Sequence, residues 1–336
     1  ASGDAGERLP VVVTVIAIAV FAAAWLGGLL PALREERQLA GQLRSAQQLE
    51  SHVRTQLQDR RQSLHAMEHD PEELLRSVRW ALSGVLRSVP PAAVGGVGLT
   101  CQRSTCLFWD AGSGKALTPA LSWQDRRGEE ICKALSPHAL PIIRKTGLRL
   151  SPHYAASKIR WLLDSTPGLR RLAESGRARF GTLDSYLLFR LTGGASWSTD
   201  PTHAARTLLM DLRRLDWDPD LLDLFGVGYR CLPPIRPSVF PAGELRIRGT
   251  RIRITATVGD QQAALLGLGC SRRGELAINY GTGAFAALNT GRRPVRVPGL
   301  LTSVAWSSEK AVRFLLEGPV NAAGSALEWM EGLVGP

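Results

Sequence analysis

The stretch 258-VGDQQAALLG-267 places a single aspartate, Asp260, where one type of backbone structure changes into another. The run before it, 251-RIRITAT-257, alternates polar or charged residues with apolar ones, which predicts a strand. The following QQAALLG is typical of the first turns of a helix. Asp260 therefore lies at a strand-to-helix junction directly after Gly259, where it either only caps the helix or has a chemical role.

The chain from Glu68 onward alternates short strand patterns with helical patterns. A turn at Glu68 precedes a helix that has Pro71 near its start. The segments that follow are VGGVGLT (94–100), STCLFWD (104–110), DRRGEEICKAL (125–135), YAASKIRWLLD (154–164) and TLDSYLLFRL (182–191). This alternation predicts an α/β domain.

The GSGK at 112–115 has the letters of a phosphate-binding loop without its full pattern. Such a loop needs an earlier glycine and a Ser or Thr after the lysine, and this chain has Trp109 and Ala116 at those positions. We therefore interpret GSGK as a hairpin turn between strands.

Composition indicates a folded protein with an arginine-biased surface. The 336 residues are 44% hydrophobic and 21% charged, with a formal net charge of +11. The basic residues are spread along the chain without a basic, aromatic-interleaved motif, so we expect no nucleic acid partner; phosphorylated small molecules would suit such a surface. The five cysteines are irregularly spaced, which predicts reduced thiols and no metal site.

Residues 9–33 contain no charged side chain and are long enough for a transmembrane helix. A signal peptide is the alternative, but its apolar region is usually shorter and a small-residue cleavage site should follow. Arg34 and Arg37 follow instead, and the positive-inside rule then places the rest of the chain in the cytoplasm. The protein would be cytoplasmic altogether if this segment were not native to it.

Residues 34–67 form a second, amphipathic segment. Apolar residues recur three or four apart, which predicts a stalk helix with coiled-coil character and a possible route to a homo-oligomer. They are Leu39, Leu43, Ala46, Leu49, Val53 and Leu57.

The motifs from Glu68 to Met330 resemble the FGGY family of carbohydrate kinases, and within it the glycerol kinase branch. They occur in family order with family-like spacing. The matching stretches are EHDPEEL (68–74), GLTCQRST (98–105), WQDRRGEEIC (123–132), SKIRWLLD (157–164), FGTLDSYLLFRLTGG (180–194), TDPTHAARTLLMDL (199–212), LPPIRPS (232–238), GDQQAALLG (259–267), NYGTGAF (279–285) and LEGPVNAAGSALEWM (316–330).

The resemblance implies an actin-like, ribonuclease H-like α/β fold. Two domains, here 68–250 and the start of a second at 251–336, would close over a cleft that binds a small polyol or sugar. The implied reaction moves the γ-phosphoryl group of ATP, with Mg²⁺, to a substrate hydroxyl. Asp260 matches the family's catalytic base, and a carboxylate at a helix N-terminus is favoured as the anion that accepts a proton.

Five further residues fall at positions of the family's substrate site, and three of them match its pattern. Arg103 matches an arginine in the substrate cleft. Trp123 matches the residue that packs against the carbon atoms of the polyol. Gln261 matches a residue that binds a substrate hydroxyl. Ser104 stands where the glycerol kinase pattern has Glu, and His153 where it has Tyr. Both differences fall on residues expected to contact substrate hydroxyls, so the resemblance leaves the choice between glycerol, another polyol and a sugar open.

The implied nucleotide site is glycine-rich. Gly281, Thr282 and Gly283 resemble the family's second phosphate loop, although a tight hairpin would use the same glycines. Gly324 and Glu328 match positions that line the nucleotide pocket, with Gln in glycerol kinases at the latter.

Two parts of the family pattern are absent from this sequence: an Asp-Gly-Thr phosphate loop before Glu68, and the adenosine-binding segment after Pro336. Unpaired strand edges and exposed apolar faces are therefore expected. The alternative function is a membrane-anchored, catalytically inactive kinase-like protein that acts in binding or scaffolding.

Overall fold

The computed structural model describes residues 67–320, apart from 91–92, 248 and 281–283. The chain divides into two compact units, 1–64 and 65–336, and every described residue belongs to the second. The predicted membrane span and almost all of the predicted stalk lie outside the described residues. Across the part that is described, no helix combines the length and the apolar character needed to cross a bilayer.

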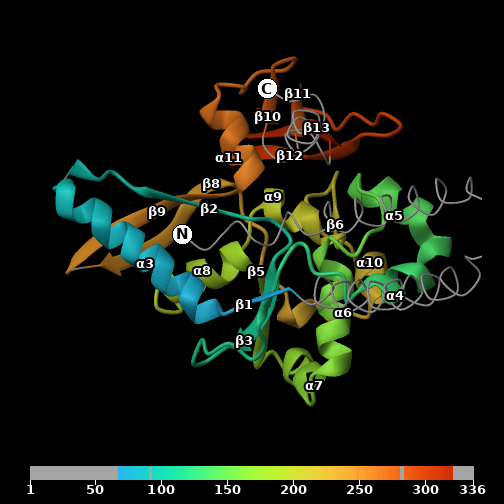
Figure 1. The fold of residues 1–336 in the computed structure, drawn as a ribbon, viewed down its shortest axis with the longest axis horizontal. Coiled ribbons are helices and arrows are strands. Elements are labelled where there is room, and N and C mark those ends of the chain that lie inside the picture. Colours follow the sequence, from blue (N-terminus) through green and yellow to red (C-terminus); the bar gives the residue numbers. More distant parts are fainter. Residues whose placement is uncertain (1–66, 91–92, 248, 281–283, 321–336) are drawn as a thin grey trace, which may run out of the picture. The chain divides into compact units, whose positions relative to one another are not determined.

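The first sheet carries the strand-to-helix junction. Its order is β2 (Val97–Cys101), β9 (Thr250–Gly259) and β8 (Val239–Ile247), with β2 parallel and β8 antiparallel to β9. Two helices lie near this sheet, α3 (Pro71–Ser88) and α8 (Leu183–Leu191) (Figure 1). Both supply apolar side chains to its core. Because β9 pairs with β2, this sheet continues past residue 250, where the second domain was predicted to begin.

The second sheet has the order β1 (Glu68–His69), β4 (Ala120–Leu121), β3 (Cys106–Asp110) and β5 (Ala178–Thr182). Its largest buried side chains include Phe108 and Phe180, whose rings lie 5.4 Å apart. The helices that follow β4 in the chain are α4 (Glu129–Ala134), α5 (Ala139–Thr146), α6 (Ala155–Ser165) and α7 (Leu169–Glu174). The main apolar core joins this sheet and these helices to apolar residues of the segment 204–232 and to Val304 and Phe314.

A set of short elements follows α8. They are α9 (Pro201–Ala204), a 3-10 turn (Ala205–Thr207), the paired strands β6 (Met210–Asp211) and β7 (Asp216–Trp217), and α10 (Pro219–Phe225). Asp200 and Asp218 begin α9 and α10 by accepting backbone N–H bonds from His203 and Leu221, with a proline next in the chain.

The third sheet lies beyond α11 (Asp260–Gly267) in the chain. Its order is β10 (Leu276–Tyr280), β11 (Ala284–Gly291), β13 (Ala311–Val320) and β12 (Leu301–Ser308), all antiparallel. Leu265 of α11 packs on it against Ala277 and Leu315. On the edge strand β10, Leu276 and Ile278 are 52% and 56% exposed.

The predicted α/β alternation is confirmed, with shifted ends that have local causes. The strand predicted from 104 starts at Cys106, because Ser104 has a left-handed backbone (φ 66°) that no strand accommodates. The helix predicted from 125 starts at Glu129, because Asp125 accepts the N–H of Arg127 in a turn. Residues 68–69, predicted as a turn, pair with β4.

The hairpin interpretation of residues 112–115 is also confirmed. Trp109 and Ala116 form an antiparallel bridge across the turn. The carboxylate of Asp110 accepts the N–H groups of Gly112 and Ser113, and these hydrogen bonds lower its pKa. The amides that a phosphate would need are therefore already satisfied by the chain itself.

Candidate active site

The candidate site forms where β2 and β9 end side by side. Cys101 and Gly259 are paired in the parallel register, so the residues after both strands emerge at the same edge of the sheet. Arg103 follows β2 and Asp260 follows β9, and Arg103 Nε lies 3.5 Å from Asp260 Oδ1. Ligand sites in α/β sheets occur at such carboxyl ends.

Asp260 is the first residue of α11 and its side chain is 45% exposed. Its Oδ1 accepts the N–H of Gln261 at 2.8 Å, so it partly satisfies the helix terminus. The same carboxylate faces a guanidinium and remains reachable from solvent. A capping contact and a chemical role are therefore compatible in this residue.

Gly259 allows this close approach. A Cβ at this position would lie 2.6 Å from Arg103 Cδ and 2.8 Å from Gln262 Oε1, far inside normal contact distance. Its N–H donates to Thr202 Oγ1 at 2.8 Å, which fixes the backbone just before Asp260. The glycine that precedes the aspartate in the sequence is thus explained by the side chain of Arg103.

A buried charge cluster supports Arg103 from behind. Arg103 Nη1 donates to Glu317 Oε1 at 2.9 Å, and Arg206 pairs with the other oxygen of the same carboxylate. The three side chains are 10%, 7% and 8% exposed in the order Arg103, Glu317, Arg206. Burial and the neighbouring Arg103 lower the pKa of Arg206 to about 9, and burial also lowers the pKa of Arg103.

The remaining predicted substrate residues lie on neighbouring loops. The Trp123 and His153 rings meet edge to face, with centroids 5.1 Å apart. Ser104 is buried and its hydroxyl donates to the Arg206 carbonyl at 3.1 Å, so the hydroxyl proton is already engaged. Gln261 is half-buried beside Asp260.

The predicted nucleotide residues 281–283, Gly324 and Glu328 lie outside the described residues. The strands on either side of 281–283 are described: β10 ends at Tyr280, and β11 begins at Ala284 and runs antiparallel to it. The glycine-rich segment therefore connects two paired strands, a position that suits either a phosphate loop or a tight hairpin.

A buried polar network lies beneath the strand ends. His203 is fully buried; its Nδ1 is 2.9 Å from Asp200 Oδ1 and 3.7 Å from Asp184 Oδ2, and its Nε2 is 3.4 Å from Cys101 Sγ. Asp200 also accepts from Thr202, the residue that holds the Gly259 amide. Burial alone would lower the pKa of His203, but Asp184, Cys101 and Asp200 outweigh it and raise that pKa well above 6.5.

This network predicts a pH dependence of stability. Folded His203 keeps its proton to higher pH than unfolded His203, so its contribution is complete below about pH 6.5 and is lost as pH rises toward the folded pKa. We expect the difference in unfolding free energy between wild type and His203→Asn to shrink between about pH 6 and pH 8.5. Urea unfolding at several pH values measures it. The exposed His138→Asn is the control, and a difference that does not change with pH would contradict the prediction.

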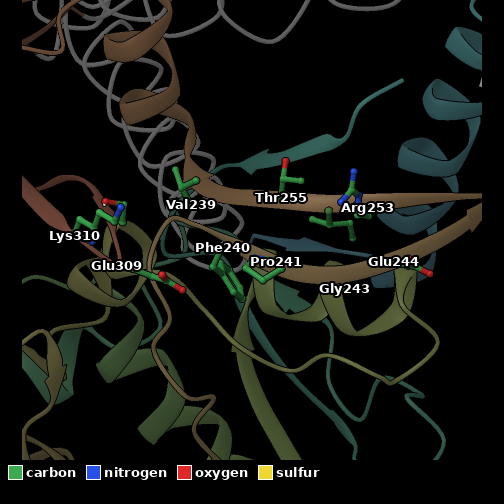
Figure 2. A pocket seen from close by; sticks show the side chains of 11 residues that line it. Val239, Phe240, Pro241, Gly243, Glu244, Arg253, Thr255, Glu309 and Lys310 are labelled. Carbon is green, nitrogen blue, oxygen red and sulfur yellow. Dashed lines mark hydrogen bonds between the residues drawn. The ribbon is translucent and has the colours of Figure 1, made fainter. Parts of the chain in front are cut away.

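The groove in Figure 2 is a separate feature of about 620 Å³. Strands β8 and β9 line it together with the turn between β12 and β13, from which Glu309 and Lys310 extend. Among the predicted site residues that the structure describes, none lines this groove.

Three buried charged residues in or beside the site were not singled out from the sequence. They are Arg206, Glu317 and Lys158, whose ammonium group donates to main-chain carbonyl oxygens of the predicted substrate residues. Each lies inside a stretch that matches the family, namely SKIRWLLD, TDPTHAARTLLMDL and LEGPVNAAGSALEWM. The sequence offered only one indication of them, a charged residue within a motif that matches the family. A charged residue in such a motif does not by itself indicate burial.

Comparisons with known proteins identify the family and the relatives of this chain. Residues 39–267 match the N-terminal domain of the FGGY family of carbohydrate kinases, a match that begins upstream of Glu68. A glycerol kinase from Thermus brockianus is 46% identical over 278 residues, which cover 80% of this chain and 56% of that protein. The chain thus spans little more than half the length of the curated relatives it matches.

Solved structures match over similar shares of this chain and of their own chains. The crystal structure of Plasmodium falciparum glycerol kinase with ADP has a TM-score of 0.73 and 31% identity, covering 80% of this chain and 56% of that one. A xylulose kinase from Rhodospirillum rubrum, at 19% identity and a TM-score of 0.72, shares the fold. The described α/β structure is accordingly the actin-like kinase fold. With a family match over more than half of its residues, this chain belongs to the FGGY family of carbohydrate kinases.

Proposed function

We propose that this chain carries the substrate side of an ATP-dependent, glycerol kinase-like enzyme that phosphorylates a hydroxyl of a small polyol or sugar. The observation that carries the proposal is the pairing of Asp260 with Arg103 at the joined carboxyl ends of β2 and β9. The relatives named glycerol kinase support the polyol class of substrate.

Asp260 is the proposed base. The substrate hydroxyl must lose its proton as its oxygen attacks phosphorus, and an accessible carboxylate within hydrogen-bond reach accepts that proton. Arg103 has a fixed position because Glu317 holds it from behind, and it contributes a guanidinium beside Asp260 that hydrogen-bonds a substrate hydroxyl. Trp123 and His153 contribute ring surface for the carbon chain.

Specificity among polyols and sugars depends on the two positions that differ from the glycerol kinase pattern. The Ser104 hydroxyl donates into the protein rather than toward a ligand, and the His153 ring packs on Trp123. Neither side chain reproduces the glutamate or the tyrosine of the glycerol kinase pattern. We therefore include tetritols, pentitols and sugars alongside glycerol as candidate substrates.

Mg-ATP would supply the γ-phosphoryl group and charge neutralisation at the phosphates. The residues predicted to hold it, 281–283, Gly324 and Glu328, lie outside the described part of the chain. The steps assigned to this chain's own described residues are the binding and orientation of the acceptor and the removal of its proton.

The test is ADP formation by the purified full chain with Mg-ATP and a panel of glycerol, longer polyols, pentoses and hexoses. Activity that depends on both ATP and one acceptor class is the expected result. If no acceptor stimulates ADP formation, and calorimetry detects no binding of these acceptors, the kinase function is wrong for this chain; the inactive binding or scaffolding role then becomes the better description.

A further inference from the structure

Lys158 of α6 is fully buried, and the steps proposed above do not use it. Its ammonium group donates to three main-chain carbonyl oxygens: His153 O at 2.8 Å, Trp123 O at 3.2 Å and Ser104 O at 3.5 Å. These acceptors belong to three separate loops, and each is a residue that the sequence assigns to the substrate site.

The surroundings make this an unusual position for a lysine. The charged and titratable groups facing it are Asp125, Arg127, Cys106, Cys132 and His153. Asp125 is already paired with Arg127, at 2.9 Å. Burial lowers the pKa of Lys158 to about 8, whereas burial raises the pKa of both thiols. Burying an ammonium group costs free energy when its hydrogen-bond acceptors are neutral carbonyls. A role for this lysine in the surrounding structure would explain why it is there.

We propose that Lys158 is a positioning residue for the acceptor site: it holds the main chain at Ser104, Trp123 and His153 so that Arg103 and the Trp123–His153 ring pair face the substrate together. This inference rests on the proposed kinase function. Lys158 does not touch the substrate; it acts through the three loops.

Loss of the ammonium leaves up to three carbonyl oxygens without this donor, and the loops are then free to shift relative to one another. Recognition of the acceptor depends on all three loops, so its affinity falls. The predicted nucleotide residues lie elsewhere in the chain, so the affinity for ATP should stay unchanged. A parallel loss of both affinities would instead indicate general structural damage.

The experiment compares wild type, Lys158→Met and Lys145→Met as full chains. Met keeps the length and apolar stem of lysine without the donor. Lys145 of α5 is the control, because its ammonium group pairs with the carboxylates of Asp218 and Asp220 and not with the carbonyl oxygens of the three loops. Hydrogen exchange at residues 103–105, 122–126 and 151–155 is measured together with KM for the best acceptor and KM for ATP.

We expect faster exchange at all three segments and an acceptor KM raised about tenfold in Lys158→Met, with KM for ATP within about twofold of wild type. Lys145→Met should resemble wild type. Unchanged exchange at the three segments, or an unchanged acceptor KM, would overturn the inference. If wild type phosphorylates no acceptor, the proposed function fails, and exchange alone then decides whether Lys158 holds the three loops.

Wild type offers a second measurement that does not depend on the variant folding. A neutral amine has two hydrogens for three carbonyls, so at least one bond is lost as pH rises through the pKa of about 8. Acceptor KM should therefore rise several-fold between about pH 7 and pH 9.5 while KM for ATP stays level. A flat acceptor KM over this range counts against the inference.

Discussion

Asp260→Asn is expected to lower kcat for ATP-dependent acceptor phosphorylation by about 10²- to 10⁴-fold. The amide has nearly the shape of the carboxylate but cannot accept the hydroxyl proton. Its carbonyl oxygen still accepts the Gln261 N–H, so the start of α11 is preserved. Steady-state kinetics and calorimetric titration of the acceptor into the variant measure the two effects separately.

The matched control is Asp223→Asn, an exposed aspartate on α10 away from the strand ends. It should leave kcat and acceptor binding unchanged. Acceptor binding to Asp260→Asn should stay within a few-fold of wild type, because Arg103 and the ring pair remain. Turnover by Asp260→Asn at the wild-type rate would remove Asp260 from the mechanism and leave it as a helix-terminal residue.

Glu317→Leu is expected to lower the free energy of unfolding by about 3–5 kcal/mol. The carboxylate joins two buried guanidinium groups, and its removal leaves Arg103 and Arg206 close together without the anion between them. Chemical denaturation at neutral pH measures the change. Glu309→Leu, at the exposed turn of the same hairpin, should change stability by no more than about 0.5 kcal/mol.

A double variant separates the effect of the two unpaired guanidinium groups from the effect of lost packing. Arg206→Leu added to Glu317→Leu removes one of the two stranded charges, so the double variant should recover part of the lost stability. If the stability lost in the double variant equals the sum of the losses in Glu317→Leu and in Arg206→Leu, Arg206 does not interact energetically with Glu317. A loss below about 1 kcal/mol for Glu317→Leu alone would mean that solvent reaches the cluster and screens it.

Much of the local structure follows from short-range patterns. Asp260 was predicted at a strand-to-helix junction, and α11 begins at that residue. Pro71 lies at the start of its helix as predicted, and the structure adds Asp70 as the residue that caps it by accepting the N–H of Glu72. Pattern rules failed where a side chain or a single backbone angle altered a boundary, as at Asp125 and Ser104.

The site was only partly predictable. Its named residues came from ordered motifs, which gave no contact between them; the structure places Arg103 against Asp260. Glu317 was missed because it is 214 residues from its partner Arg103. Lys158 was missed because a lysine in a helix is usually exposed, and its three carbonyl acceptors are main-chain atoms that no residue pattern records.

The sequence by itself determined the order of strands and helices, the aspartate at the junction and the family, because each of these depends on residues that are neighbours in the chain. Only the tertiary structure decided which charges are buried together. Parallel pairing of β2 with β9 brings Arg103 to Asp260, and the packing of β13 behind them adds Glu317 and leaves Arg206 with a lowered pKa. Burial and charge proximity depend on the packing of distant segments, and those two quantities control the chemistry of this site.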